Sequence, residues 1–198
     1  NRAVCKYNVG NISNSLFSKR NQEYTYRLLL EHGCETIEQL RAGKITPALE
    51  DCVCAALQVT GVISAMACGG KQAAVSHTLY SYFCCVHPEL AAGFLHGELV
   101  GSTLVYQLAV NGAPKEAQEA LNRVLRALGM PTCLEELGLK ETPEEADRIF
   151  AFLAERMPVE TPKELQRLRG ESDVLFHGLR DSAGKLQTKR GEAHETGI

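Results

Sequence analysis

Two segments decide the fold: AAVSHTLY at residues 73–80 and FLHGELVG at residues 94–101. In both, apolar residues recur at the three- and four-residue spacing of an amphipathic helix. The loop between them is short and contains a proline and a glycine, and helices joined by such a loop pack antiparallel. Each segment carries one histidine, so this geometry can bring His77 and His96 to one point.

The histidine pair is a candidate metal site, because a neutral imidazole is the commonest metal ligand in proteins. Spacing alone leaves a second interpretation open, in which each histidine is a hydrogen-bonded residue of the core. The residues around His77 and His96 favour metal binding over a core position, and we expect both histidines to be ligands.

The sequence resembles the metal-binding core of the glycerol dehydrogenase branch of the iron-containing alcohol dehydrogenase superfamily. Both histidine segments carry the resemblance, and it continues in ITPALE at residues 45–50 and in LGMPTCLEELGL at residues 128–139. It covers roughly residues 25–155, most of the chain. Dehydroquinate synthase belongs to the same superfamily and shares the Leu-His-Gly-Glu segment at residues 95–98.

The resemblance implies a fold, a reaction and a cofactor set. Members of this branch oxidise a secondary hydroxyl of a small polyol and pass a hydride to NAD. One divalent metal, zinc in this branch and iron in others, is held by two histidines and one aspartate and acts as a Lewis acid on the substrate oxygen. His77 and His96 occupy the two histidine positions. Histidine and aspartate donors accept Zn²⁺ or Fe²⁺.

Two parts of such an enzyme have no counterpart in this sequence. The aspartate ligand belongs to a Gly-Asp pair at the start of the helical domain, and the nearest look-alike is Gly10-Asn11, which lacks the negative charge. No Gly-rich strand–turn–helix unit of an NAD-binding domain occurs. We therefore expect the C-terminal, metal-binding half of the enzyme, with an N-terminal nucleotide-binding domain as its missing partner, whether as a fragment or as a natural short protein.

Two residues beside the histidines refine this expectation. Glycerol dehydrogenases tend to carry a further histidine three residues after the first, where this sequence has Tyr80. A tyrosine there can donate a hydrogen bond or relay a proton, although the ordinary role of such a residue is a buried aromatic. Glu98 either orients a metal ligand or faces the positive end of the helix dipole, and we favour the second interpretation.

Three other functions stay open. A dehydroquinate synthase-like enzyme is one, because the synthase has Gly-His-Thr where this sequence has Ser-His-Thr at residues 76–78. A glycerol-1-phosphate dehydrogenase-like member of the same superfamily is another. The third is a non-catalytic helical remnant that serves as an interaction module, which the missing aspartate and nucleotide domain favour.

The fold class expected is all-α, a helical bundle of about seven helices. The apolar period predicts helices over residues 21–42, 47–68, 71–86, 96–111 and 114–128. Thr-x-x-Glu capping boxes at Thr132, Thr142 and Thr161 predict further helix starts. No strand alternation is found, which leaves helix on helix as the architecture.

Three regions follow from the same pattern. Residues 1–20 are polar and aperiodic, which predicts an irregular N-terminal segment. Residues 21–170 form the helical metal-binding domain. From 171 to 198 the apolar period fails and charged residues and glycines dominate, which predicts a disordered tail.

The helix expected over residues 47–68 is apolar nearly all round after Asp51, which predicts a central, buried position. A chain without its nucleotide domain would also expose the apolar surface that normally meets that domain. We therefore expect a homo-oligomer.

Composition excludes several functions. The net charge of −3 gives no general attraction to nucleic acid, and no apolar run approaches the ~20 residues of a membrane span. No export signal is evident, so we expect a cytoplasmic protein whose eight cysteines are reduced and mostly buried. A zinc site using Cys84 and Cys85 is disfavoured, because neighbouring helix residues cannot both face one metal.

The other histidines are assigned no chemistry. His87 precedes a proline in the loop and is expected to be exposed, His32 lies at a helix end, and His177 and His194 lie in the expected tail.

Overall fold

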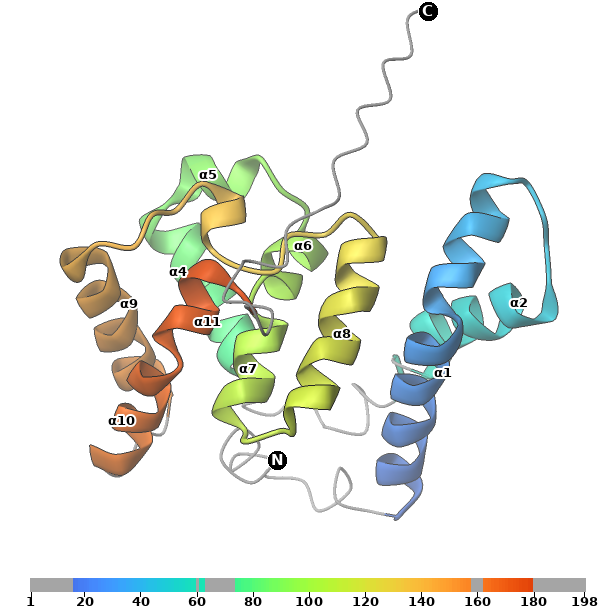
Figure 1. Ribbon diagram of the computed structural model, residues 1–198, viewed down its shortest axis with the longest axis horizontal. Coiled ribbons are helices and arrows are strands. Elements are labelled where there is room, and N and C mark those ends of the chain that lie inside the picture. Colours follow the sequence, from blue (N-terminus) through green and yellow to red (C-terminus); the bar gives the residue numbers. More distant parts are fainter. Residues whose placement is uncertain (1–15, 60, 63–73, 158–161, 180–198) are drawn as a thin grey trace, which may run out of the picture.

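A computed structural model of the chain describes residues 16–59, 61–62, 74–157 and 162–179. These residues form helices and connecting loops without any strand, so the predicted all-α bundle is confirmed (Figure 1). The helices are α1 (Leu16–Arg41), α2 (Pro47–Cys54), the π-helical turn η2 (Ala55–Val59), α4 (Val75–Val86), α5 (Pro88–Ala92), α6 (His96–Gly101), α7 (Leu104–Val110), α8 (Lys115–Ala127), the 3-10 turn η3 (Glu135–Leu137), α9 (Pro143–Arg156), α10 (Pro162–Gly170) and α11 (Ser172–His177).

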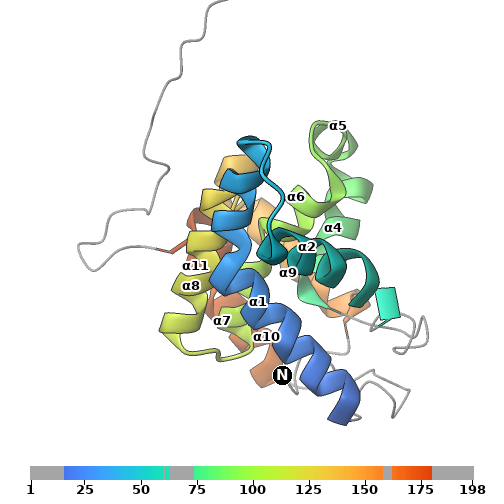
Figure 2. The same ribbon diagram turned by 90° about the vertical axis from the view of Figure 1, so that its right-hand side faces the viewer.

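The helices fall into a main bundle and a smaller hairpin. In Figure 1 the bundle of α4, α7, α9, α10 and α11 lies on one side and the hairpin of α1 and α2 on the other, with α8 between them. Helix α1 packs against α2 and against α8, and it crosses the front of the molecule in Figure 2. The bundle therefore carries the histidine segments, and α8 connects it to the hairpin.

The core of the bundle is built where α4 packs against α9 and α7 packs against α11. Leu79, Tyr82 and Phe83 on α4 are fully buried, as are Ile149 on α9 and Leu175 on α11. Fully burying a side chain of this size stabilises the fold by about 1.5–3 kcal/mol. One face of α4 is thus fixed in the core, which determines the direction in which its opposite face points.

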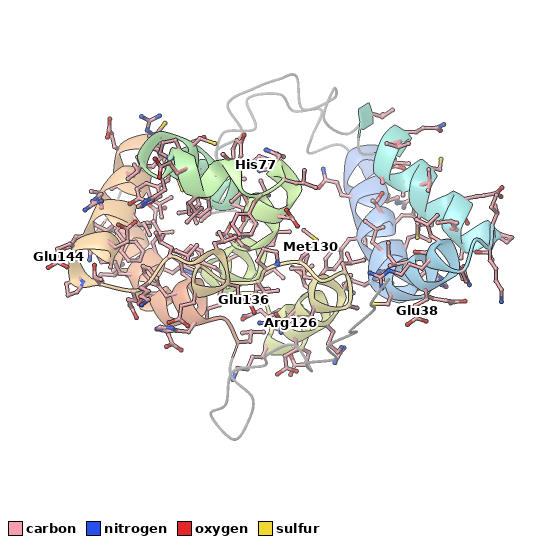
Figure 3. The ribbon with its side chains drawn as sticks, turned by 90° about the horizontal axis from the view of Figure 1, so that it is seen from above. Glu38, His77, Arg126, Met130, Glu136 and Glu144 are labelled. Atoms are coloured by element: carbon pink, nitrogen blue, oxygen red, sulfur yellow. The ribbon has the colours of Figure 1, made fainter. Side chains whose placement is uncertain are left out.

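The predicted helix starts are confirmed at one of the three capping boxes. The Thr142 hydroxyl accepts a hydrogen bond from the Glu145 amide at 3.1 Å at the start of α9. The box at Thr132 is wrong: only the turn η3 follows, and the Glu136 carboxylate instead accepts a hydrogen bond from the Thr132 amide at 2.7 Å. Glu136 also pairs with Arg126 of α8 (Figure 3), so it fastens this loop to the bundle. Thr161 lies outside the described residues.

The helix predicted over residues 47–68 is not central. Regular α-helix ends at Cys54, and the side chains of Val53 and Leu57 are 48% and 73% exposed. Only one face, with Leu49, Cys52 and Ala55, is buried, because this segment packs against α1 at the edge of the molecule. Residues 63–68 lie outside the described part.

The helix predicted over residues 96–111 is divided into α6 and α7. Ser102 and Thr103 separate them, and each hydroxyl donates to the carbonyl three residues earlier, at 2.8 Å for Ser102 and 3.1 Å for Thr103. Side chains that bond back to the backbone in this way compete with the helical pattern. The break turns α7 into the bundle.

Both ends of the helical domain differ from the prediction. Helix α1 begins at Leu16, inside the segment expected to be irregular. The expected tail is wrong over residues 172–179, because α11 forms there and buries Leu175 and Phe176 completely. The Leu134 amide donates to the Leu175 carbonyl at 3.0 Å, which joins α11 to the loop before η3. A six-residue helix is too short to show a period in the sequence.

The cysteines are less buried than expected. Of the six described, Cys52 and Cys133 are buried and Cys34 is half-buried, whereas Cys54, Cys84 and Cys85 are exposed; all six are free thiols. No helix among the described residues has the length and apolar character to cross a membrane.

Candidate metal centre

The structure brings His77 and His96 together. His77 lies in the first turn of α4 and His96 is the first residue of α6. Their ring centroids are 5.8 Å apart and their planes are inclined by 50°. Both side chains are exposed, and Figure 3 shows His77 at the edge of the bundle. The convergence on which the metal hypothesis depends is therefore present.

The position of His77 is fixed by its neighbours in α4. Val75, Ser76 and Leu79 are buried against the core, which leaves His77 on the outer face. The Ser76 amide donates a hydrogen bond to the Gln107 side-chain oxygen on α7 at 3.0 Å. This contact satisfies one of the N-terminal amides that a helix leaves without an internal partner. The first turn of α4 is thus anchored to α7.

The start of α6 fixes His96. The Glu98 carboxylate accepts a hydrogen bond from the Leu95 amide at 2.8 Å, which closes the first turn around the backbone of His96. Leu99 and Gly101 are buried and orient the short helix. The helix-start interpretation of Glu98 is confirmed. Glu98 acts on the histidine through the backbone rather than through the ring.

The ring separation of the pair is close to the separation expected for two imidazoles on one tetrahedral metal. With zinc–nitrogen bonds of about 2 Å, two coordinated imidazoles have ring centroids roughly 5 Å apart, and the observed separation is 5.8 Å. Partial burial lowers the pKa of His77, and the neighbouring His96 lowers it further. Both effects favour the neutral form of His77, which is the form that binds a metal.

The third ligand is not found with the pair. Across the described ranges, no group of three or more His, Cys, Asp or Glu side chains is arranged to hold a metal. Gly10-Asn11, the look-alike of the aspartate segment, lies outside those ranges. The assignment of His77 and His96 as metal ligands stays a prediction, with a fitting pair of donors as its structural basis.

Tyr80 is part of the same cluster and is half-buried rather than a core residue. Its ring meets that of His96 at a centroid distance of 4.3 Å and an interplanar angle of 75°. A side-chain hydrogen bond with Cys84 raises the pKa of Tyr80. The residue at the place of the family's further histidine thus contacts one of the two candidate ligands.

His87 is not the exposed loop residue that the sequence predicts. Its Nε2 lies 2.7 Å from Oε1 of Glu145, and the same oxygen accepts a hydrogen bond from the buried Tyr82 hydroxyl at 2.6 Å. Burial raises the pKa of Tyr82, and the hydrogen bond and charge of Glu145 raise it further. Because these partners are 58 and 63 positions apart, no local pattern could indicate the contact.

His177 is likewise paired. Its Nδ1 lies 3.0 Å from a Glu135 oxygen and its Nε2 lies 2.8 Å from a Glu141 oxygen. Burial lowers the pKa of His177, but the hydrogen bonds and charges of the two carboxylates outweigh that effect, so the pKa is raised. The side chain therefore connects α11 to both ends of the loop around η3.

Comparison with known proteins finds two related glycerol dehydrogenases. The chain is 32% identical over 132 residues to a glycerol dehydrogenase of Escherichia coli O6:H1, which is 67% of this chain and 34% of that protein. It is 31% identical over 136 residues to a glycerol dehydrogenase of Pseudomonas putida, which is 66% of this chain and 34% of that protein. The chain is a relative of glycerol dehydrogenases.

The comparison covers only part of each relative. The chain spans about a third of the length of these two glycerol dehydrogenases. No family model matches it. The crystal structure of a probable glycerol dehydrogenase from Sinorhizobium meliloti 1021 superimposes with a TM-score of 0.64, over 85% of this chain and 51% of that one. At 18% sequence identity this superposition shows the shared fold.

Proposed function

We propose that the chain is the helical, metal-binding half of an NAD-dependent polyol dehydrogenase of the glycerol type. The observation that carries the proposal is the convergence of His77 and His96, 5.8 Å apart, in a relative of glycerol dehydrogenases. The catalytic ion is Zn²⁺ or Fe²⁺, and the substrate is a small polyol. NAD binds through a nucleotide-binding domain that these residues do not contain.

The fit of a metal rests on the donors present. Two imidazoles from two anchored helices present exposed rings at a separation compatible with one ion. When bound, the ion supplies Lewis-acid polarisation of a substrate hydroxyl. A carboxylate from outside the described residues completes the ligand set. Among the described residues, Glu98 does not form a metal-holding group with the two histidines, and its side chain accepts the Leu95 amide at the start of α6.

The residues of this chain then have distinct tasks. His77 and His96 hold the ion. Glu98 fixes the backbone turn that carries His96, and Gln107 fixes the turn that carries His77 through the Ser76 amide. Since a displacement of about 1 Å in a catalytic group can cost ~100-fold in rate, these two anchors are part of the function.

Isothermal titration of the metal-free chain with Zn²⁺ tests the proposal. We expect one site, weakened at least tenfold in His77→Ala and in His96→Ala, because each variant removes one of the two imidazole ligands. His32→Ala is the matched control, since it removes a histidine from α1 and leaves the pair intact. Equal zinc affinity in the parent and in His77→Ala would refute the ligand assignment.

A non-catalytic interaction module is the second candidate, and the incomplete ligand set in the described residues favours it. The coding sequence upstream of Asn1 discriminates between the two. A βαβ region with a Gly-rich turn and a Gly-Asp pair would establish the enzyme. A native start codon next to Asn1 would establish the module. A dehydroquinate synthase-like or glycerol-1-phosphate dehydrogenase-like activity would use the same pair and is distinguished by substrate assays.

The compartment is part of the proposal. Cys54, Cys84 and Cys85 are exposed thiols without a disulfide partner among the described residues. Exposed free thiols persist in reducing surroundings. We infer a cytoplasmic location.

A further inference from the structure

Among the described residues, no hydrogen-bonded partner of the kind that usually orients a metal ligand contacts the ring of His96. A ligating histidine ordinarily donates its second ring N–H to a carboxylate, a carbonyl or a water, and this contact fixes the ring. Within the described residues the ring of His96 makes only aromatic contacts, with His77 at 5.8 Å and with Tyr80 at 4.3 Å. Tyr80 is the nearer of the two rings and is therefore the one that can restrain the ring of His96.

The contact between Tyr80 and His96 has a restraining geometry. Their planes are inclined by 75°, which is the edge-to-face arrangement that aromatic pairs prefer. Rotation of the His96 ring about its Cβ–Cγ bond would break this arrangement. Tyr80 follows His77 by three positions in α4, so both residues share one face of that helix. The face of α4 that carries His77 therefore also carries the group that contacts His96.

Tyr80 is itself held in place. Its ring packs against the main core cluster of the bundle. A side-chain hydrogen bond with Cys84, one turn further along α4, raises the pKa of Tyr80. The ring is thus held mainly by its packing against the core. A side chain fixed in this way can orient an exposed neighbour.

We propose that Tyr80 is the positioning residue for His96, holding its ring in the orientation in which it shares one metal ion with His77. This inference rests on the proposed function, because it concerns the same pair of ligands. It assigns a task to the residue three positions after His77, where the sequence resemblance implies a further histidine in glycerol dehydrogenases. It also explains how the exposed ring of His96 can be held in one orientation before a metal binds.

Three variants of the full chain separate the ring from the hydroxyl. Tyr80→Leu removes the ring, Tyr80→Phe keeps the ring and removes the hydrogen bond to Cys84, and Tyr24→Leu removes an exposed tyrosine of α1 as a control. Far-UV circular dichroism establishes that each variant folds. The His96 ring protons are followed by NMR in the metal-free chain, and Zn²⁺ affinity is measured by titration calorimetry.

We expect Tyr80→Leu to bind Zn²⁺ roughly three- to tenfold more weakly, the factor that one edge-to-face pair supplies. Its His96 ring protons should move toward their positions in an unstructured peptide. The electronic absorption of bound Co²⁺, which reports ligand geometry, should change in parallel. Tyr80→Phe should restore all three readouts to near the parent values, and Tyr24→Leu should leave them unchanged.

The contrary outcomes are distinct. Unchanged His96 resonances in Tyr80→Leu would overturn the contact, and changed resonances with an unchanged affinity would overturn its role at the metal. Tyr80→Phe behaving as Tyr80→Leu would also overturn the inference, because the ring would then have no effect of its own. If the parent chain bound no Zn²⁺, the proposed function and this role would fall together, while the NMR comparison would still report the contact itself.

Discussion

Tyr82 on α4 donates a 2.6 Å hydrogen bond to Glu145 on α9, and both residues are buried. The carboxylate also contacts Nε2 of His87 at 2.7 Å and, more distantly, Arg148 at 3.5 Å. A buried carboxylate is costly unless it is paired and hydrogen-bonded. Glu145 meets that requirement, and in doing so it joins the end of the histidine-bearing helix to α9.

The first prediction concerns this carboxylate. Glu145→Ala should lower the free energy of unfolding by about 2–3 kcal/mol, because it leaves the buried Tyr82 hydroxyl without an acceptor. Glu144→Ala, in the same turn of α9 but exposed, should change it by less than about 0.5 kcal/mol. Urea unfolding followed by circular dichroism measures both. Equal stability of the two variants would show that the buried contact contributes nothing.

The second prediction concerns pH. The pKa of His177 is raised above its ordinary value by Glu135 and Glu141, after burial has partly offset the rise. A histidine whose pKa is higher in the folded state stabilises the fold fully below the unfolded pKa of about 6.5. That contribution is lost as the pH rises through the folded pKa. The parent chain should therefore be more stable at pH 6 than at pH 8.5 by an increment that His177→Gln removes.

Unfolding in urea at the two pH values measures the increment. Charge-assisted hydrogen bonds of this kind contribute about 1.5–3 kcal/mol, and we expect His177→Gln to cost about 1 kcal/mol more at pH 6 than at pH 8.5. His32→Gln is the control on α1. A pH dependence that is the same in the parent and in His177→Gln would assign the effect to other groups.

The third prediction concerns a turn. Gly112 has a φ of 69°, and a Cβ added there would lie 2.5 Å from Nη2 of Arg167. Gly112→Ala should destabilise the chain by about 1–2 kcal/mol, because side chains other than glycine disfavour this conformation. Gly97→Ala, where an added Cβ meets nothing within 4 Å, should be tolerated. Thermal unfolding compares the two, and equal melting temperatures would contradict the expected strain.

The sequence was informative where structure depends on local patterns. Thr46 with Pro47 and Thr142 with Pro143 both begin helices, because a hydroxyl that caps an amide and a proline in the first turn act within four residues. His77 and His96 converge because the apolar faces of their helices must pack on one core. These features follow from spacing along the chain.

The sequence failed where a contact joins distant positions. Nothing near His87 indicates Glu145, and nothing near His177 indicates Glu135 or Glu141, because each pair forms only after the helices pack. Helix α11 was not predicted from the sequence for a related reason. Its six residues carry too little periodicity, and its stability comes from burying Leu175 and Phe176 in a core built by other segments.

The hairpin of α1 and α2 exposes apolar surface, and this is the basis on which we expect self-association. An open, largely apolar cavity of about 540 Å³ lies between this hairpin and α7 and α8. Val53, which lines this cavity, is 48% exposed, and Leu57, one turn further along the chain, is 73% exposed. Large exposed apolar patches on soluble proteins mark interaction sites. The segment expected to be central lies at the edge of the molecule instead, and it therefore exposes this apolar surface.

The fourth prediction is that the chain self-associates through this surface. Leu57→Asp should lower the apparent mass in light scattering at high concentration, because a charge at the contact must be desolvated when two copies meet. Leu95→Asp is the matched control, since Leu95 is 74% exposed but lies at the start of α6, in the main bundle. A parent chain that remains a monodisperse monomer would refute self-association. An equal response of the two variants would place the contact elsewhere on the chain.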